Sequence, residues 1–109
     1  MKMNALQYLL ETRRTRPEGG NPLLQGALGL ASEAGEVTGL LEKHLCQGHE
    51  MDPVKLKKEL GDVMWYLAMV LDEMDWTFEE VMEANVAKLR TRYPEKFSTE
   101  ASVKRVDEK

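Results

Sequence analysis

Two pairs made of an Asx residue followed by proline constrain the fold of this chain more than any other feature. The pairs are Asn21-Pro22 and Asp52-Pro53. The side chain of Asn or Asp accepts a hydrogen bond from the unpaired amides of a first helical turn. Proline in that turn has no amide that would remain unpaired. Each pair therefore predicts the start of a helix.

Further local signals predict where the other helices begin and end. Thr77 and Glu80 form a capping box, and Pro94 disfavours helix in the residue before it. Gly48 marks the end of the helix that follows Asn21, and the segment 17–20 contains proline and two glycines. The expected helices span residues 4–14, 22–46, 53–74 and 77–92.

Composition agrees with a helical protein. Aromatic residues make up 6% of the chain, whereas Leu, Ala, Met, Glu and Lys are abundant, and these residues favour helix. A chain of 109 residues has room for one domain. We predict an all-α domain of four helices over residues 1–97. From Ser98 onward the chain is polar and loses its periodicity, so we predict a loosely held tail over residues 98–109.

The stretch 63–71 is apolar around the whole circumference of the third expected helix. A helix in a small bundle normally keeps one face in water. Three other helices can barely enclose this one, so we expect a homodimer that completes a helical bundle. The alternative is that this helix lies at the centre of a monomeric bundle.

Charge and hydropathy exclude several classes of function. Fifteen basic against nineteen acidic residues give a net charge of −4, which argues against a protein that grips the phosphates of nucleic acid. No stretch approaches the roughly 20 apolar residues that cross a membrane, and the N-terminus lacks the apolar segment of a secretory signal. A single cysteine, Cys46, forms no internal disulfide, so we expect a cytoplasmic protein.

Four acidic residues lie at the edges of apolar stripes. Glu33 and Glu36 are three residues apart on the second expected helix, and Glu59 and Asp62 repeat that spacing on the third. Two antiparallel helices with such pairs bring four carboxylates to one place. Like charges about 5 Å apart repel by about 3 kcal/mol at an effective dielectric near 20, so the group must bind protons or a cation.

Oxygen ligands without histidine favour Mg²⁺, with Mn²⁺ as a substitute, over zinc or copper. The chemistry indicated is metal-assisted hydrolysis of a phosphate ester or anhydride. A glycine lies between the acids of each pair, Gly35 and Gly61, which indicates close approach by backbone or ligand at those positions.

Solvated helix faces carry the same spacing of acids, and this chain has two further pairs of that kind. Glu80 precedes Glu83 by three residues, but Glu80 belongs to the capping box with Thr77. Asp72 and Asp75 form the other pair and lie at the end of the third expected helix. Spacing alone therefore does not distinguish a metal ligand from a surface acid.

Two other metal chemistries do not fit the sequence. A ferritin-like di-iron bundle needs Glu-x-x-His, and Leu41 and Cys46 occupy the positions three before the two histidines, His44 and His49. A zinc site built from His44, Cys46 and His49 lacks the usual fourth ligand.

The acidic segments resemble a known family. Leu30-Ala31-Ser32-Glu33-Ala34-Gly35-Glu36-Val37, followed by Glu59-Leu60-Gly61-Asp62-Val63, is similar to the two acidic elements of the MazG-like all-α nucleoside triphosphate pyrophosphohydrolases. The resemblance continues to Tyr93-Pro94 and covers roughly residues 20 to 98. The family often carries an extra Glu beside the first pair, where this chain has Ser32, so the number of metal ions stays open.

The resemblance implies Mg²⁺-dependent cleavage between the α- and β-phosphates of a nucleotide, with release of a monophosphate and pyrophosphate. It makes Glu33, Glu36, Glu59 and Asp62 the metal ligands and catalytic residues, one of which, or a neighbouring group, would orient or deprotonate the attacking water. It also implies a homodimer or a dimer of dimers. The expected role is removal of particular canonical or damaged nucleotides from the nucleotide pool.

Residues of the fourth expected helix fit a role in phosphate binding. Asn85, Lys88 and Arg92 share one face, and the resemblance places them at the substrate. Basic residues near a helix C-terminus also interact favourably with the helix dipole in any protein. Trp65 follows Asp62 by three residues and is placed to stack on a base, although an aromatic at this spacing is more often part of the core.

Two other functions stay open. One is a phosphoribosyl-ATP pyrophosphohydrolase of histidine biosynthesis, which belongs to the same superfamily. The other is a non-catalytic helical module for dimerisation or regulation, whose acids bind a structural cation.

Overall fold

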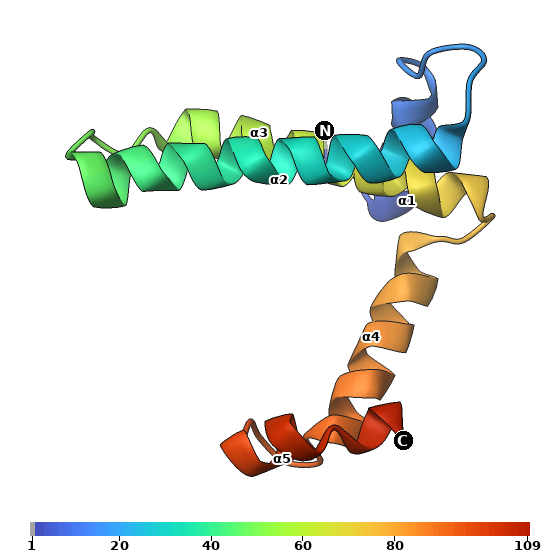
Figure 1. The fold of residues 1–109 in the computed structure, drawn as a ribbon. Helices are drawn as coiled ribbons and strands as arrows, with labels where there is room; N and C mark the ends of the chain where they lie inside the picture. Colours follow the sequence, from blue (N-terminus) through green and yellow to red (C-terminus); the bar gives the residue numbers. More distant parts are fainter. Residues whose placement is uncertain (1) are drawn as a thin grey trace. The chain divides into compact units, whose positions relative to one another are not determined.

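A computed structural model describes residues 2–109, and the elements in this range are helices without a strand (Figure 1). They are α1 (Ala5–Arg13), α2 (Pro22–Gln47), α3 (Pro53–Glu73), α4 (Phe78–Arg92), α5 (Thr99–Lys104) and a short 3-10 turn, η1 (Val106–Glu108). The contacts divide the chain into two units, one that ends at Asp75 and one that comprises Trp76–Lys109. Among the described residues, no helix has both the length and the apolar character needed to cross a membrane.

The predicted helix boundaries are confirmed because the local capping signals act as expected. Asn21 and Asp52 accept hydrogen bonds from Leu24 N and Lys55 N, with proline next in the chain. Thr77 accepts a hydrogen bond from Glu80 N, and Glu80 accepts one from Thr77 N, which is the predicted capping box. Gly48 ends α2 with a φ of 74°, a left-handed conformation that glycine adopts without steric cost.

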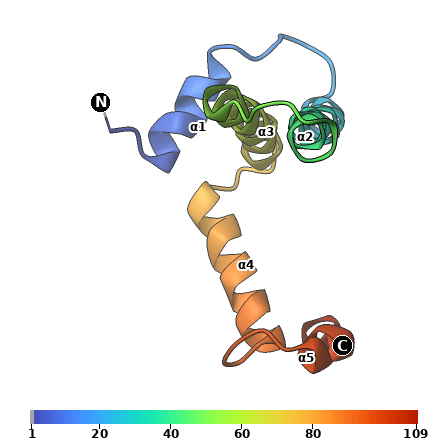
Figure 2. The same ribbon diagram turned by 90° about the vertical axis from the view of Figure 1, so that its left-hand side faces the viewer.

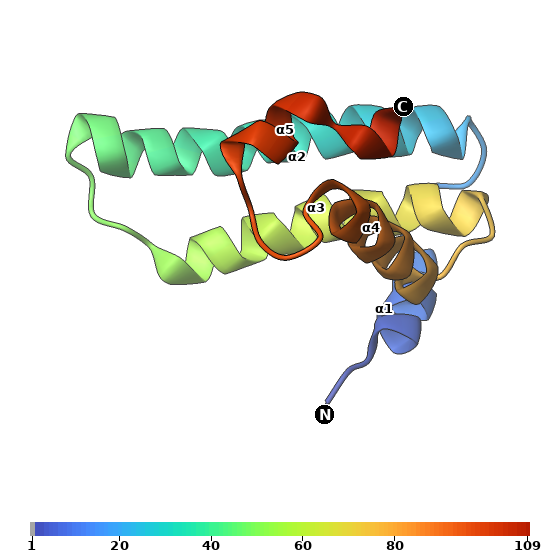
Figure 3. The same cartoon turned by 90° about the horizontal axis from the view of Figure 1, so that it is seen from below.

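In the first unit α2 and α3 run antiparallel, side by side (Figure 3), and α3 lies between α2 and α1 (Figure 2). Two glycines permit the close approach of α2 and α3. A Cβ at Gly26 would lie 2.6 Å from Val70 Cγ2, and a Cβ at Gly29 would lie 2.1 Å from Tyr66 Cε1. Because any larger residue would displace these side chains, glycine sets the separation of the two helices.

The core of the first unit is small. Its buried apolar residues are Leu9 of α1 and Ala68, Met69 and Leu71 of α3. Met64, on the stretch expected to be enclosed on every side, remains 47% exposed, since α1 and α2 cover only part of α3. The helical class is therefore confirmed, while a bundle completed by a second copy stays a prediction.

The second unit corrects the expectation of four helices and an irregular tail. Ser98 caps α5 by accepting a hydrogen bond from Ala101 N, and the chain then turns through η1. The Arg92 guanidinium donates to both carboxylate oxygens of Asp107, at 2.7 and 2.9 Å. Hydrophobic periodicity does not reveal an element held by an ion pair, which is why the tail was predicted to lack structure. The predicted boundary between a domain that ends at residue 97 and a tail over residues 98–109 stays a prediction.

Candidate metal centre

Two helices bring three of the four predicted acids together in the first unit. Glu33 lies on α2, one turn after the contact between Gly29 and Tyr66, and Glu59 and Asp62 lie on α3. One carboxylate oxygen from each of these three acids lies within 4.8 Å of the others. Glu33 and Glu59 are half-buried, and Asp62 is exposed. We call these three residues the acidic group.

The acidic group is electrostatically unfavourable without a cation. Burial raises the pKa of the Glu33 carboxyl, and the negative charges of Asp62, Glu59 and Glu36 raise it further. A hydrogen bond between Glu33 and Glu59 acts in the same direction, since it requires a shared proton. A divalent cation would replace that proton and offset the repulsion. Three carboxylates without histidine are the ligand set that Mg²⁺ or Mn²⁺ prefers, so the residues fit the predicted metal.

Glu36 lies outside the acidic group and is exposed. Its charge still contributes to the raised pKa of Glu33, so it lies near enough to interact with that carboxylate. The role of Glu36 as a ligand therefore stays a proposal.

The two glycines between the acids do not serve close backbone packing. A Cβ at Gly35 or Gly61 would meet no other atom of the described chain within 4 Å. Of the two predicted explanations, close approach by backbone is not found among residues 2–109, where the tight contacts between α2 and α3 lie at Gly26 and Gly29; close approach by a ligand stays a prediction. The space beside Gly35 and Gly61 leaves room for a ligand.

Tyr8 of α1 is a neighbour of the site that sequence reasoning missed. Its hydroxyl donates a hydrogen bond of 3.3 Å to the carbonyl oxygen of Gly61, between the two acids of α3. Burial raises the pKa of the Tyr8 hydroxyl, and the charge of Asp62 adds to this effect. Tyr8 precedes Gly61 by 53 residues, and no spacing rule connects positions so distant in the sequence.

The predicted phosphate-binding residues lie on α4, in the second unit. Asn85 and Lys88 are exposed. Arg92 is engaged by Asp107, and this hydrogen bond raises the pKa of the guanidinium. A phosphate at Arg92 would have to compete with the Asp107 carboxylate.

The histidines and the cysteine form no comparable group within residues 2–109. His44 Nδ1 lies 2.8 Å from the carbonyl oxygen of His49, and Cys46 is an exposed free thiol. In the part of the chain that the structure describes, the acidic group is the cluster whose side chains could hold a metal ion.

Comparison with known proteins agrees with this site. The family model of the MazG nucleotide pyrophosphohydrolase domain matches residues 24–97, a range that includes both acidic pairs and α4. The chain belongs to the MazG family. The Gene 37 protein of Mycobacterium phage L5 is 36% identical over 72 residues, which are 60% of this chain and 60% of the phage protein. No solved structure is significantly similar to the chain.

The match to the MazG family begins after α1. The N-terminal segment with Tyr8, Thr15 and Pro17 lies outside the matched range, although Tyr8 contacts the backbone beside Asp62. The contact between Tyr8 and Gly61 is therefore a feature of this chain that membership of the MazG family does not by itself explain.

Proposed function

We propose that this MazG-family chain hydrolyses nucleoside triphosphates to a monophosphate and pyrophosphate and depends on Mg²⁺, for which Mn²⁺ can substitute. The observation that carries the proposal is the acidic group, whose three carboxylates converge within 4.8 Å. Burial, followed by the charges of Asp62 and Glu59, raises the pKa of Glu33 in this group. The family match covers the same residues. Clearance of particular nucleotides from the nucleotide pool is the biological role that fits such an activity.

The residues of this site divide into three roles. Glu33, Glu59 and Asp62 would hold the cation, which would supply positive charge to the phosphate oxygens as charge develops in the transition state. Glu36 is exposed beside the group, so its carboxylate is placed to accept a proton from the attacking water or to complete the ligand set. Asn85, Lys88 and Arg92 would bind the outer phosphates.

We also propose that the active form is a homodimer or a dimer of dimers. No residue of α4 is buried, and Met82 and Val86 on that helix are 58% and 47% exposed. An isolated helix of this length is marginal in water, so a partner that covers its apolar residues would stabilise it.

Pyrophosphate release from a panel of nucleoside triphosphates, with and without Mg²⁺, tests the proposed activity. We expect Glu36→Gln and Asp62→Asn to reduce release by roughly 100-fold or more while circular dichroism shows an unchanged helical content. Glu73→Gln, an exposed acid on the same helix as Asp62, is the matched control and should keep native turnover. Hydrolysis in ¹⁸O-labelled water would show which product carries the label and hence which phosphorus is attacked.

Native turnover in Asp62→Asn would contradict the proposal. Metal binding without turnover of any nucleotide would instead favour a non-catalytic regulatory module, and turnover confined to phosphoribosyl-ATP would favour the histidine pathway enzyme.

A further inference from the structure

A groove runs along the first unit beside the acidic group. Its volume is about 410 Å³, which is within the range of small-ligand sites. Trp65, Tyr66 and Met69 of α3 form one side, and Gln25, Ser32 and Pro17 contribute from α2 and the loop before it. Both apolar surface and a few polar groups line it, as is typical of a site for an organic ligand.

The groove lies one helical turn from the metal-binding carboxylates. Trp65 and Tyr66 follow Asp62 by three and four residues, and Glu33 follows Gly29, another lining residue, by four. Residues at these spacings are neighbours on a helix surface, about 5–6 Å apart. A ligand whose phosphates reach the acidic group can therefore place its other end in the groove.

The indole of Trp65 is held in position by two contacts. Its Nε1–H donates a hydrogen bond of 3.0 Å to Thr15 Oγ1, and its ring meets the Tyr66 ring edge to face, with centroids 5.0 Å apart. A ring that is fixed before the ligand arrives loses little conformational entropy on binding. Trp65 is thus a preorganised wall of the groove.

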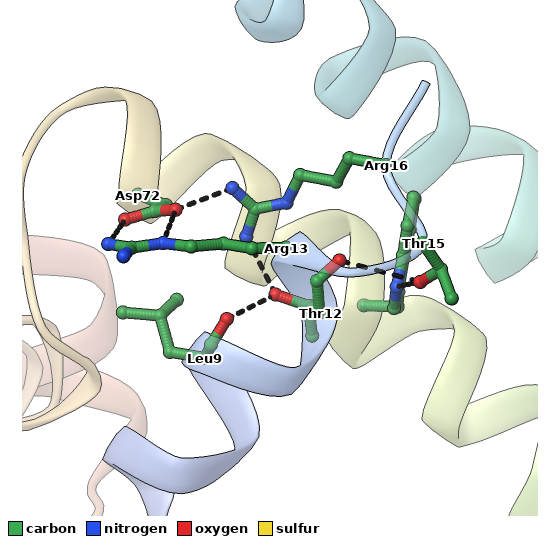
Figure 4. Close-up of polar contacts among 7 residues, drawn as sticks. Leu9, Thr12, Arg13, Thr15, Arg16 and Asp72 are labelled. Carbon is green, nitrogen blue, oxygen red and sulfur yellow. Dashed lines mark hydrogen bonds and ion pairs between the residues drawn. The ribbon is translucent and has the colours of Figure 1, made fainter. Parts of the chain in front are cut away.

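The segment that carries Thr15 and Pro17 is itself anchored to α3 (Figure 4). Arg13 and Arg16 both donate hydrogen bonds to the carboxylate of Asp72, and Arg16 also donates to Thr12 Oγ1 at 2.6 Å. Thr12 in turn donates to the carbonyl oxygen of Leu9. This network fixes the loop side of the groove before any ligand binds.

The chemistry of the lining selects an uncharged, flat group. None of the described residues that line the groove carries a charge, so the groove offers no positive charge to a phosphate. An aromatic face stacks on any nucleobase, and the Gln25 amide presents a donor and an acceptor to a base edge.

We propose that this groove binds the nucleobase of the substrate, with Trp65 as the stacking residue and Gln25 as the polar contact. The inference rests on the proposed function, since it assumes that the phosphates lie at the acidic group. Sequence spacing left Trp65 open between stacking on a base and a place in the core, and on this proposal it is a residue that determines specificity.

Binding is tested without catalysis by two variants that each keep one tryptophan. Trp76→Phe leaves Trp65 as the fluorescent reporter, and Trp65→Phe leaves Trp76, which does not line the groove, as the matched control. Both are titrated with AMP, GMP, CMP, dTMP and, as a probe without a base, ribose 5-phosphate. We expect saturable quenching of Trp65 by at least one nucleotide, no effect of ribose 5-phosphate, and no change at Trp76. Equal quenching by ribose 5-phosphate, or none by any nucleotide, would overturn the proposal.

Kinetics provide the second test. Trp65→Ala should lower kcat/KM for the preferred nucleotide by about 10-fold or more, the usual contribution of one stacked base. It should also change the ratio of kcat/KM between nucleotides with different bases, which a loss of stability alone would not do. Thr15→Val keeps the ring but removes the hydrogen bond that positions it, and should shift that ratio in the same direction by less. An unchanged ratio in Trp65→Ala would contradict the proposal.

The two proposals fail in different ways. Nucleotide binding at Trp65 without cleavage of any triphosphate would support the groove as a base site and reject the proposed function. Cleavage with no quenching at Trp65 would keep the proposed function and reject the groove as the base site.

Discussion

Asp72 ties the N-terminal segment to α3 through two arginines. Arg13 donates through Nε and Nη2 at 2.7 Å each, and Arg16 donates through Nη1. The hydrogen bonds from Arg13, with those from Arg16, lower the pKa of Asp72 from 3.8 to about 2, although burial opposes the shift. The spacing of Asp72 and Asp75 resembles that of the metal ligands, but Asp72 has a structural role.

This network predicts a loss of stability in acid. Because the pKa of Asp72 is lower in the folded chain than in the unfolded chain, its contribution is present above about pH 4 and disappears as the pH falls from 3.8 toward 2. Asp72→Asn should remove about 1 to 2 kcal/mol of unfolding free energy at pH 7, after allowance for screening by solvent. Urea unfolding at pH 7 and pH 2.5 measures both effects.

Asp75→Asn is the control for this prediction. Asp75 lies just after the end of α3, three residues from Asp72, and its φ of 59° is a conformation that asparagine tolerates. Unfolding free energies for Asp72→Asn and Asp75→Asn that agree at pH 7 would contradict the role assigned to the arginine contacts.

At the level of helices, the separation of α2 and α3 determines whether the acids of the site meet. Gly29 lets the Tyr66 ring lie directly against α2, one turn from Glu33. A Cβ at Gly35 or Gly61 would instead meet no other atom of the described residues within 4 Å. Within α2, Gly29 therefore permits close helix packing, whereas helix packing does not account for Gly35 among the described residues.

Alanine substitutions distinguish these glycines. Gly29→Ala should lower the unfolding free energy by about 1–3 kcal/mol, because its Cβ would lie 2.1 Å from Tyr66 Cε1 and the ring would have to move. Gly35→Ala meets no atom within 4 Å and should be neutral or stabilise the helix by up to about 1 kcal/mol. Urea unfolding of both variants provides the comparison, and equal destabilisation by the two would show that Gly29 is not a close contact.

Within the second unit, α4 is joined to η1 by charge and not by an apolar core. Asp107 and Arg92 leave only 4% and 10% of their side chains exposed, whereas no residue of α4 is buried. The hydrogen bond from Arg92 lowers the pKa of Asp107. The ion pair thus orders a segment whose sequence is mostly polar.

For the molecule as a whole, many apolar side chains are exposed within residues 2–109. The first unit buries four apolar residues, and apolar side chains of every long helix remain exposed, Leu24, Met64 and Met82 among them. Exposed apolar surface of this kind is typical of protein–protein interfaces. A second copy of the chain is the partner that we propose for them.

Light scattering after size-exclusion chromatography tests this proposal. We expect the native chain to elute with twice or four times the mass of one chain. The double variant Met82→Lys and Val86→Lys places charge on the apolar face of α4 and should reduce that mass toward one chain, while Glu79→Gln, an exposed change on the same helix, should not. A native chain of single mass at all concentrations would contradict the proposed assembly.

The positions of the long helices depend on interactions over three or four residues. Asn21, Asp52 and Thr77 cap the helices that follow them, and these signals are visible in the sequence because cap and amide lie within one turn. The spacing of Glu33 with Glu36, and of Glu59 with Asp62, likewise indicated which acids share a helix face. The helical class and the convergence of three of the four acids were therefore predictable, while their role as a site stays a prediction.

Tertiary contacts decided what lies between these elements. Glu33 meets Glu59 and Asp62 while Glu36 lies outside the group, because Gly26 and Gly29 fix the distance between α2 and α3. Trp65 lines the groove, and a hydrogen bond to Thr15, which lies 50 residues earlier in the chain, holds its indole in position. Contacts over such separations depend on how the helices pack, and helical periodicity carries no information about packing partners. Residue spacing thus predicts where the long helices begin and which acids share a helix face. The shape of the site depends on how the helices pack against one another.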